Sequence, residues 1–309
     1  MPADPILRPA VAADAAPLAA LWATAFSPPL PPDQWLVDPD RLAHTIVAVD
    51  EEGVTGSIYG LPKRLREDDG AVASVHCIGS VAVADRARGR GIARRLVTAT
   101  LESAGRAGAD WALLFTGTPE VYRSSGFETF TMRRSLTGPW GAAGGATDAG
   151  TPDAGSSDAA VRRDPVRLDQ LLTGAEAYEG SRAGVVLAPV RSAQDWAMAA
   201  VRLDGMTLYR TDGGYAVAEV RDGLGVLAEL AAVDPRARDV LLEAVAADWR
   251  AGGAVRVDIA VPDRAEDVVA VRGFAPAAQP VRDGTGMTRP VRRSPRITGI
   301  RHFGAADYF

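Results

Sequence analysis

The sequence has 309 residues, of which 47% are hydrophobic, so it is long enough for two domains with substantial cores. Its formal net charge of −5 argues against general nucleic-acid binding, and no apolar run is long enough to span a membrane. The single cysteine, Cys77, rules out an internal disulfide and fits a reducing, cytoplasmic compartment. It lies in an apolar strand pattern, which predicts a small core residue and not a nucleophile.

The first 83 residues predict a strand, two helices and three further strands. Residues 6–8 start as a strand, and Ala12–Phe26 is expected to form a buried helix that the proline-rich run 27–32 ends. Asp33 would cap a short second helix through Trp35. The remaining strands are expected at 44–49, 54–65 and 71–83.

A strand, a glycine-rich turn and a helix then follow one another. Val81 and Val83 alternate with alanine, as in a strand with one packed face. The turn contains Gly89 and Gly91, and apolar residues recur at four-residue spacing from Ile92 onward. The pattern predicts a helix that begins directly after the second glycine.

The start of that helix has the properties of a phosphate site. Its first backbone N–H groups have no partner inside the helix, and the helix dipole is positive there. Glycines, which lack a Cβ atom, let an anion approach these amides closely. Five arginines add positive charge in an otherwise acidic chain: Arg86, Arg88, Arg90, Arg94 and Arg95. A pyrophosphate is the ligand that suits this arrangement best.

Two further elements follow in a characteristic order. A strand is expected at 111–116, and after it Tyr122 precedes the pair Gly126-Phe127. The segment 88–93, Arg-Gly-Arg-Gly-Ile-Ala, resembles the R/Q-x-x-G-x-G/A signature of the GCN5-related N-acetyltransferase (GNAT) superfamily, and the tyrosine segment looks like the family's Y-x-x-x-G-F element. With a last strand expected at 127–137, residues 1–138 match the GNAT order of elements.

The resemblance implies binding of acetyl-CoA, without a metal. In the family, the strand before the signature separates from its neighbour and pairs with the pantetheine arm, a role that falls here on Val81, Ala82 and Val83. Gly117 and Thr118 would touch the same arm from the end of the next strand. The pyrophosphate would be held by Arg88, Gly89, Arg90, Gly91, Ile92, Ala93 and Arg94.

Tyr122 matches the family's general acid. A phenol with a pKa near ~10 suits protonation of a thiolate leaving group. The alternative is a structural tyrosine that packs under the turn at Gly126-Phe127 with a satisfied hydroxyl group.

The second half repeats this pattern in weaker form. Gly273-Phe274 echoes the earlier Gly-Phe pair, but no glycine lies between Asp234 and Leu241, and Val269 stands where the first half has Tyr122. Its expected elements are a strand at 227–233, a helix at 240–250 and a strand at 255–261. We therefore expect an α/β (α+β) protein of two tandem GNAT folds, each a mixed, mostly antiparallel sheet flanked by helices, with the second copy degenerate.

Composition suggests where the two copies divide. Residues 139–160 are rich in Gly, Ala, Ser and Pro and are expected to form a flexible linker without a role in the core. The expected divisions are an active domain at 1–138, the linker at 139–160, a degenerate domain at 161–290 and a tail at 291–309.

This tandem order resembles the Eis-like acetyltransferases. In that family a sterol-carrier-like domain follows the two GNAT domains, and too few residues follow position 290 here for such a domain. Mycothiol synthase is also a tandem GNAT protein, but its second copy carries the better signature, which counts against that interpretation.

The general base has two candidates. In Eis-like enzymes the terminal carboxylate lies in the active site on an aromatic residue, and this chain also ends in one, so the Phe309 carboxylate is expected to act as base or amine anchor. His76 is the alternative base. Unbroken alternation puts it on the opposite face of its strand from Val81 and Val83, whereas a bulge near Gly79 would change that. A hydrogen-bonded structural histidine is the other interpretation of His76.

The acceptor site is expected beside the loop 27–32. Trp22, Phe26 and Trp35 are the candidate lining residues, with His76 nearby, although core packing explains Trp22 and Phe26 equally well. The leading function is an acetyl-CoA-dependent N-acetyltransferase acting on a primary amine of a small molecule, such as an aminoglycoside-like compound or a polyamine. The alternatives are a non-catalytic acyl-CoA-binding sensor or scaffold and a protein lysine or N-terminal acetyltransferase. No nucleic-acid or membrane partner is expected, and homo-oligomerisation is left open.

Overall fold

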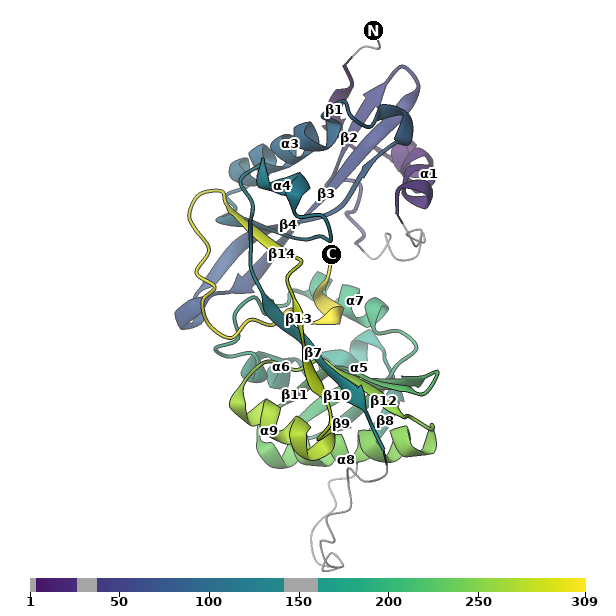
Figure 1. Cartoon of the computed structure of the whole chain (residues 1–309), viewed down its shortest axis with the longest axis vertical. Coiled ribbons are helices and arrows are strands. Elements are labelled where there is room, and N and C mark those ends of the chain that lie inside the picture. Colours follow the sequence, from purple (N-terminus) through teal and green to yellow (C-terminus); the bar gives the residue numbers. More distant parts are fainter. Residues whose placement is uncertain (1–3, 27–37, 142–160) are drawn as a thin grey trace, which may run out of the picture.

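The computed structural model describes residues 4–26, 38–141 and 161–309, which form two seven-stranded sheets flanked by helices (Figure 1). The short helix expected after Asp33 lies outside the described residues. The predicted mixed α/β architecture with two tandem sheets is confirmed.

The first sheet has the strand order β1-β2-β3-β4-β5-β14-β6. All neighbouring strands are antiparallel except β4 and β5, which run parallel. Helices α1 (Ala15–Ala25) and α3 (Ile92–Arg106) cover opposite faces of this sheet. The adjacent β2 residues Val47 and Ala48, whose side chains point to opposite faces, pack against α1 and α3, respectively. The strands are β1 (Ile6–Pro9), β2 (Thr45–Asp50), β3 (Gly53–Arg66), β4 (Val72–Val83), β5 (Trp111–Phe115), β6 (Glu128–Thr129) and β14 (Gly286–Pro290).

The second sheet has the order β13-β7-β12-β11-β10-β9-β8, and β11 and β12 form its one parallel pair among the described strands. Helix α8 (Pro235–Ala251) packs on one face, while α6 (Ala175–Ser181) and α7 (Ala193–Arg202) pack on the other. The remaining elements are β7 (Met132–Pro139), β8 (Arg162–Pro165), β9 (Thr207–Thr211), β10 (Gly214–Arg221), β11 (Leu224–Ala232), β12 (Arg256–Ile259), β13 (Gln279–Asp283), α5 (Leu168–Leu172) and α9 (Ala265–Phe274).

The two sheets exchange strands, which corrects the expected boundaries. Strand β14, from the second half, lies between β5 and β6 in the first sheet, while β7, from the first half, lies between β13 and β12 in the second. The single strand expected at 127–137 is in fact two, β6 and β7, which belong to different sheets. A cut at residue 138 would therefore remove a strand from the sheet in which it pairs.

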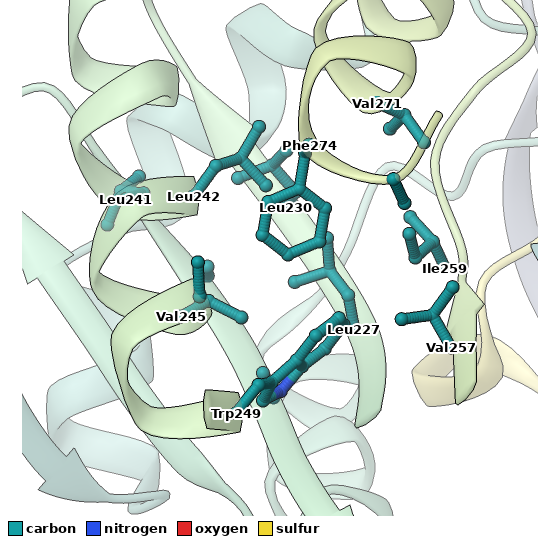
Figure 2. Packing of buried hydrophobic residues seen from close by; sticks show 14 of the residues in the cluster. Leu227, Leu230, Leu241, Leu242, Val245, Trp249, Val257, Ile259, Val271 and Phe274 are labelled. Atoms are coloured by element: carbon teal, nitrogen blue, oxygen red, sulfur yellow. The ribbon is translucent and has the colours of Figure 1, made fainter. Parts of the chain in front are cut away.

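The core of the second half also corrects the expected linker. Trp140 is buried, and its ring packs edge-on against Trp249 with the centroids 5.6 Å apart. The cluster continues through Leu227, Leu241 and Phe274 between α8, α9 and the sheet (Figure 2). The interpretation of residue 140 as linker is wrong, and residues 142–160 lie outside the described part of the chain.

Both sheets carry the same irregularity next to their parallel pair. In β4, Gly79 pairs with Tyr59 and Ala82 with Ser57, so two residues of β4 face one of β3. In β11 the register against β10 shifts just after Leu227, the last residue that pairs with β12. A shared bulge at the same topological position supports the predicted duplication.

Candidate active site

The two parallel strands of the first sheet separate at their C-terminal ends. They are paired only from Val75–Trp111 to Ile78–Leu114, yet β4 continues for five residues to Val83. Beyond Ile78 the backbone of β4 therefore bonds to β3 on one side only. Val81 and Val83 are half-buried there, so the predicted free strand edge is present.

The glycine turn opens directly into helix α3. Gly89 and Gly91 have φ values of +76° and +72°, in the left-handed region that favours glycine. A Cβ atom added to either one would meet no atom within 4 Å. The first helical hydrogen bond runs from the Arg95 amide to the Gly91 carbonyl at 3.1 Å, so the amides of residues 92–94 have no acceptor within the helix. The turn is open to an anion from outside.

The arginines around this turn differ in their partners. Arg86 forms two hydrogen bonds with Asp50, and the Arg88 guanidinium lies 2.8 Å from the Asp85 carboxylate. Arg90 lies 3.7 Å from Asp50. Arg94 is exposed on the first turn of α3, and no described residue forms an ion pair with it. The predicted positive cluster is present, but nearby carboxylates partly neutralise it.

The end of β5 provides the other wall of the opening. Gly117 and Thr118 follow this strand and are exposed. The Thr118 amide donates a hydrogen bond of 3.0 Å to the Thr116 hydroxyl, which holds the turn toward α4 (Glu120–Arg123).

Tyr122 lies on the α3 side of the opening. It packs in the same cluster as Ile78, Leu114 and Ile92, and its ring meets Phe127 edge-on at 6.1 Å between centroids. Burial raises the pKa of its hydroxyl group. No hydrogen bond links this hydroxyl to any other residue in the described part of the chain. The satisfied structural tyrosine that sequence alone left open therefore lacks its expected partner.

The main chain of Phe309 reaches the opening from the face of the sheet opposite α3. A Cβ atom placed on Gly79 would lie 2.9 Å from the main-chain oxygen of Phe309, so only glycine accommodates this contact. Gly79 is the first residue of β4 beyond its pairing with β5. The ring of Phe309 packs near Phe115 and Phe303, on the face that carries Cys77. Figure 1 shows this end of the chain between the two halves.

His76 is buried between β4 and α3. Ser80 lies in the bulge of β4 and has a φ of +48°. The bulge puts His76 and Ile78 on the same face as Val81, which is the second of the two arrangements expected from the sequence. Its Nε2 lies 2.8 Å from the Thr100 hydroxyl of α3. Burial, with a smaller contribution from His44, lowers the pKa of His76 to about 4. His76 therefore lies on the face away from Phe309, and the structure does not support its role as base or acceptor contact.

This assignment predicts how stability depends on pH. Between pH 6.5 and 4 the unfolded chain binds a proton at His76 that the folded chain does not, so acidification removes on the order of 3 kcal/mol from the free energy of unfolding. We expect His76→Gln to remove this part of the pH dependence and to leave kcat within about threefold of wild type. Urea unfolding at several pH values and steady-state kinetics test both; a loss of kcat of two orders of magnitude with an unchanged pH slope would make His76 the base.

The aromatic acceptor pocket is only partly present. Trp22 is fully buried, and its indole N–H donates a 2.9 Å hydrogen bond to the Ser57 hydroxyl. The expectation that it lines a substrate pocket is wrong, because its side chain is enclosed between α1 and the first sheet. Phe26 is half-buried against the same cluster, and Trp35 lies outside the described residues.

Sequence reasoning missed Arg41, a buried residue next to the bulge. Its guanidinium carbon lies 3.7 Å from the Tyr59 ring centroid, and one nitrogen donates a 2.6 Å hydrogen bond to the Ser80 hydroxyl. Burial lowers the pKa of Arg41 to about 10. Arg41 thus holds the bulge that re-aims β4. No sequence signal marked it, because the strained conformation of Ser80 is visible only in the structure.

The second half keeps the strand separation but closes the anion site. Helix α8 begins with Pro235, and the Asp234 carboxylate accepts a 2.9 Å hydrogen bond from the Ala237 amide. A carboxylate therefore occupies the position where the first half presents free amides. Val269 is exposed and cannot replace Tyr122 as an acid. These features agree with the predicted degeneracy of the second copy.

The described residues offer neither a metal site nor a membrane-spanning helix. They contain no group of three or more His, Cys, Asp and Glu side chains arranged to hold a metal ion. No described helix is both long and apolar enough to cross a membrane.

Comparisons with known proteins agree with this geometry. The family model of the acetyltransferase (GNAT) domain matches residues 7–130. No curated protein matches the sequence significantly. Among solved structures, a GCN5-related N-acetyltransferase from Kribbella flavida is similar at 20% identity, with a TM-score of 0.71, over 94% of this chain and 72% of its own.

Two further structures have the same fold over similar lengths. A conserved protein of unknown function from Enterococcus faecalis V583, a probable N-acyltransferase, has 16% identity and a TM-score of 0.71 over 94% of this chain and 73% of its own. Eis1 from Mycobacterium abscessus has 16% identity and a TM-score of 0.66 over 93% of this chain and 73% of its own. At these identities the similarity concerns the fold of the whole chain, while the family model assigns a GNAT acetyltransferase domain to residues 7–130 only.

Proposed function

We propose that the chain is an N-acetyltransferase that transfers an acetyl group from acetyl-CoA to a primary amine of a small molecule. The observation that carries this proposal is the free edge of β4 beyond Ile78 next to the uncapped first turn of α3. An acyl-CoA has the two matching parts, a pantetheine arm with amides and a diphosphate. The first sheet is the proposed catalytic unit, and the second binds no acyl-CoA because Asp234 caps its helix.

The reaction needs an acid and a base on opposite sides of the opening. In the first step of the proposed reaction, the Phe309 carboxylate takes a proton from the ammonium group of the acceptor. The free amine then attacks the thioester carbonyl carbon. The carbon–sulfur bond then breaks, and the Tyr122 hydroxyl protonates the departing thiolate, while the attacking nitrogen loses its second proton, which returns to the Tyr122 oxygen; the Phe309 carboxyl group releases the first proton to solvent. Because burial raises the pKa of Tyr122, the hydroxyl carries its proton throughout the neutral range. The products are an acetamide and CoA.

The position of the C-terminal tail favours a small molecule as the acceptor. Phe303, Tyr308 and Phe309 pack against Phe115 on the face opposite α3, with ring centroids 4.8–6.1 Å from Phe115. They cover part of the face from which the acceptor would approach, which disfavours a folded protein substrate. A carboxylate at the opening favours an acceptor that carries positive charge.

A thiol-release assay tests the proposal. The full chain is incubated with acetyl-CoA and, in turn, with a polyamine, an aminoglycoside, an arylalkylamine and a lysine-containing peptide, and free CoA thiol is followed over time. We expect amine-dependent thiol release and an acetylated product by mass spectrometry with at least one small amine. Binding of acetyl-CoA without amine-dependent release would instead indicate a sensor or scaffold. Release only with the peptide would indicate a protein acetyltransferase.

A further inference from the structure

The tail is tied to the second half immediately before it reaches the first. Residues Ala305–Asp307 form the short helix η4, which packs against α7 and β11. Ala306 and Asp307 are buried there. Two residues later, the Phe309 carboxyl group meets Gly79 of β4. The chain therefore crosses from one half to the other within the length of Tyr308.

A buried charge cluster makes this attachment. The Nε of Arg191 donates a 2.8 Å hydrogen bond to the Asp307 carboxylate, and its two terminal nitrogens bond to the Glu229 carboxylate at 3.0 and 2.5 Å. The Tyr215 hydroxyl donates to Glu229 as well. All three charged side chains are at most 4% exposed.

Aromatic rings fix the orientation of the guanidinium. Its carbon lies 4.0 Å from the centroid of Tyr178 and 4.6 Å from that of Trp196. Each of its three nitrogens has a carboxylate partner and two rings lie close by, so the orientation of the Arg191 guanidinium is fixed. A buried cluster of this kind contributes little net stability compared with apolar residues of the same volume, so its value lies in specifying one geometry.

We propose that Arg191 and Asp307 are positioning residues that hold the Phe309 carboxyl group at the opening between β4 and β5, so that the second half, which binds no acyl-CoA, completes the site of the first. Glu229 sits just after the bulge of β11, where the second sheet has its own separated strands. The degenerate copy thus uses its former opening to anchor the tail. This inference rests on the proposed role of the Phe309 carboxylate as base.

Two changes in the full chain separate the parts of this inference. Deleting Phe309 removes the proposed base, and we expect kcat to fall by about 100-fold or more while CoA affinity is unchanged. Asp307→Asn leaves the Phe309 carboxyl group in the chain but breaks the ion pair between Arg191 and residue 307 that holds the tail. Because a misplacement of about 1 Å costs on the order of 100-fold, kcat is expected to fall by one to two orders of magnitude.

Rescue by free carboxylate distinguishes positioning from general damage. Added formate is expected to restore part of kcat in both variants, because it supplies a base at a position that the tail no longer fills. Asp307→Glu, which keeps the charge, should fall between Asp307→Asn and wild type. It also provides a second test if Asp307→Asn does not fold. The matched control is Asp14→Asn, which breaks the two hydrogen bonds between the buried Asp14 carboxylate and the partly exposed Arg8 beside β1; it should lose stability, keep kcat and gain nothing from formate.

The outcomes are distinct. If deletion of Phe309 leaves kcat unchanged, the proposed base is wrong, and this inference fails with it. If deletion lowers kcat but the folded Asp307 variants turn over like wild type, the base stands and the anchor is overturned. A loss of kcat in the Asp307 variants that formate does not relieve would also overturn the anchor, because the damage would then lie elsewhere.

Discussion

Replacing Tyr122 by phenylalanine is expected to lower kcat by about 10²- to 10⁴-fold, the range that a positioned general acid contributes. The substitution removes one oxygen atom, while the ring keeps its packing against Phe127 and the α3 cluster. Acetyl-CoA binding should therefore be unchanged, because the diphosphate and the pantetheine arm are bound elsewhere. Steady-state kinetics with the best amine, together with calorimetric titration of CoA, measure the two quantities separately.

The matched control for this variant is Tyr209→Phe. Tyr209 lies in β9 of the second half, and its hydroxyl donates a 2.8 Å hydrogen bond to Asp248. Loss of that bond should lower stability by about 1 kcal/mol without altering kcat. A Tyr122→Phe protein that turns over like wild type would show that another group, or water, protonates the thiolate.

Filling the glycine turn should abolish acyl-CoA binding. In Gly89→Leu/Gly91→Leu each side chain would project into the open space beside the first turn of α3, where the structure leaves room for a diphosphate. Both the steric block and the loss of several charge-assisted hydrogen bonds act on the ligand, so we expect the Kd for CoA to rise by at least about 100-fold. Calorimetric titration measures this change directly.

Two other glycines provide a control in which a leucine would cause the same backbone strain. Gly205 and Gly253 have φ values of +82° and +70° and equally open Cβ positions, but they lie in the second half. Gly205→Leu/Gly253→Leu should lose a similar amount of stability, about 1–2 kcal/mol per residue, because a leucine is equally strained in the left-handed region. Its affinity for CoA should equal that of wild type. Equal weakening in both double variants would mean that strain, and not the ligand site, explains the effect.

Local patterns were sufficient to predict much of the first half. The ends of β2, β3 and β4 fall within one residue of the predicted strands, and α3 begins at Ile92 as expected. Each of these signals lies within a short stretch: a period of two in a strand, a period of four in a helix, and glycines at a turn. The glycine turn was predictable for the same reason, because Gly89 and Gly91 adopt the conformation that glycine alone adopts easily.

Long-range pairing could not be predicted in this way. That β7 would leave the first sheet and β14 would enter it depends on contacts between residues more than 100 positions apart, such as Leu113 with Thr288. Trp140 lies in a segment of low-complexity composition, so its place in a core was not apparent. Helices α5 to α7 were also missed, since they are short, and α7 in addition divides its apolar residues between the clusters of the two halves, with Met198 in the first and Trp196 in the second.

The residues of the candidate site also fall into two groups, those that local motifs predict and those that depend on the tertiary structure. The positions of Tyr122 and Phe309 followed from motifs, whereas the role of His76 depended on a bulge that only the register of β3 and β4 reveals. The anchor of the tail, Arg191, was invisible in sequence because arginine is common here and its burial is a tertiary property.

The central claim is that the amides at the start of α3 bind the diphosphate of an acyl-CoA. It is tested most directly by calorimetric titration of wild type and Gly89→Leu/Gly91→Leu with two ligands, CoA and pantetheine, which lacks the diphosphate. We predict that wild type binds CoA at least about 100-fold more tightly than pantetheine, and that the double variant loses at least about 100-fold of this preference while its pantetheine affinity is unchanged. An undiminished preference for CoA in the double variant would contradict the claim.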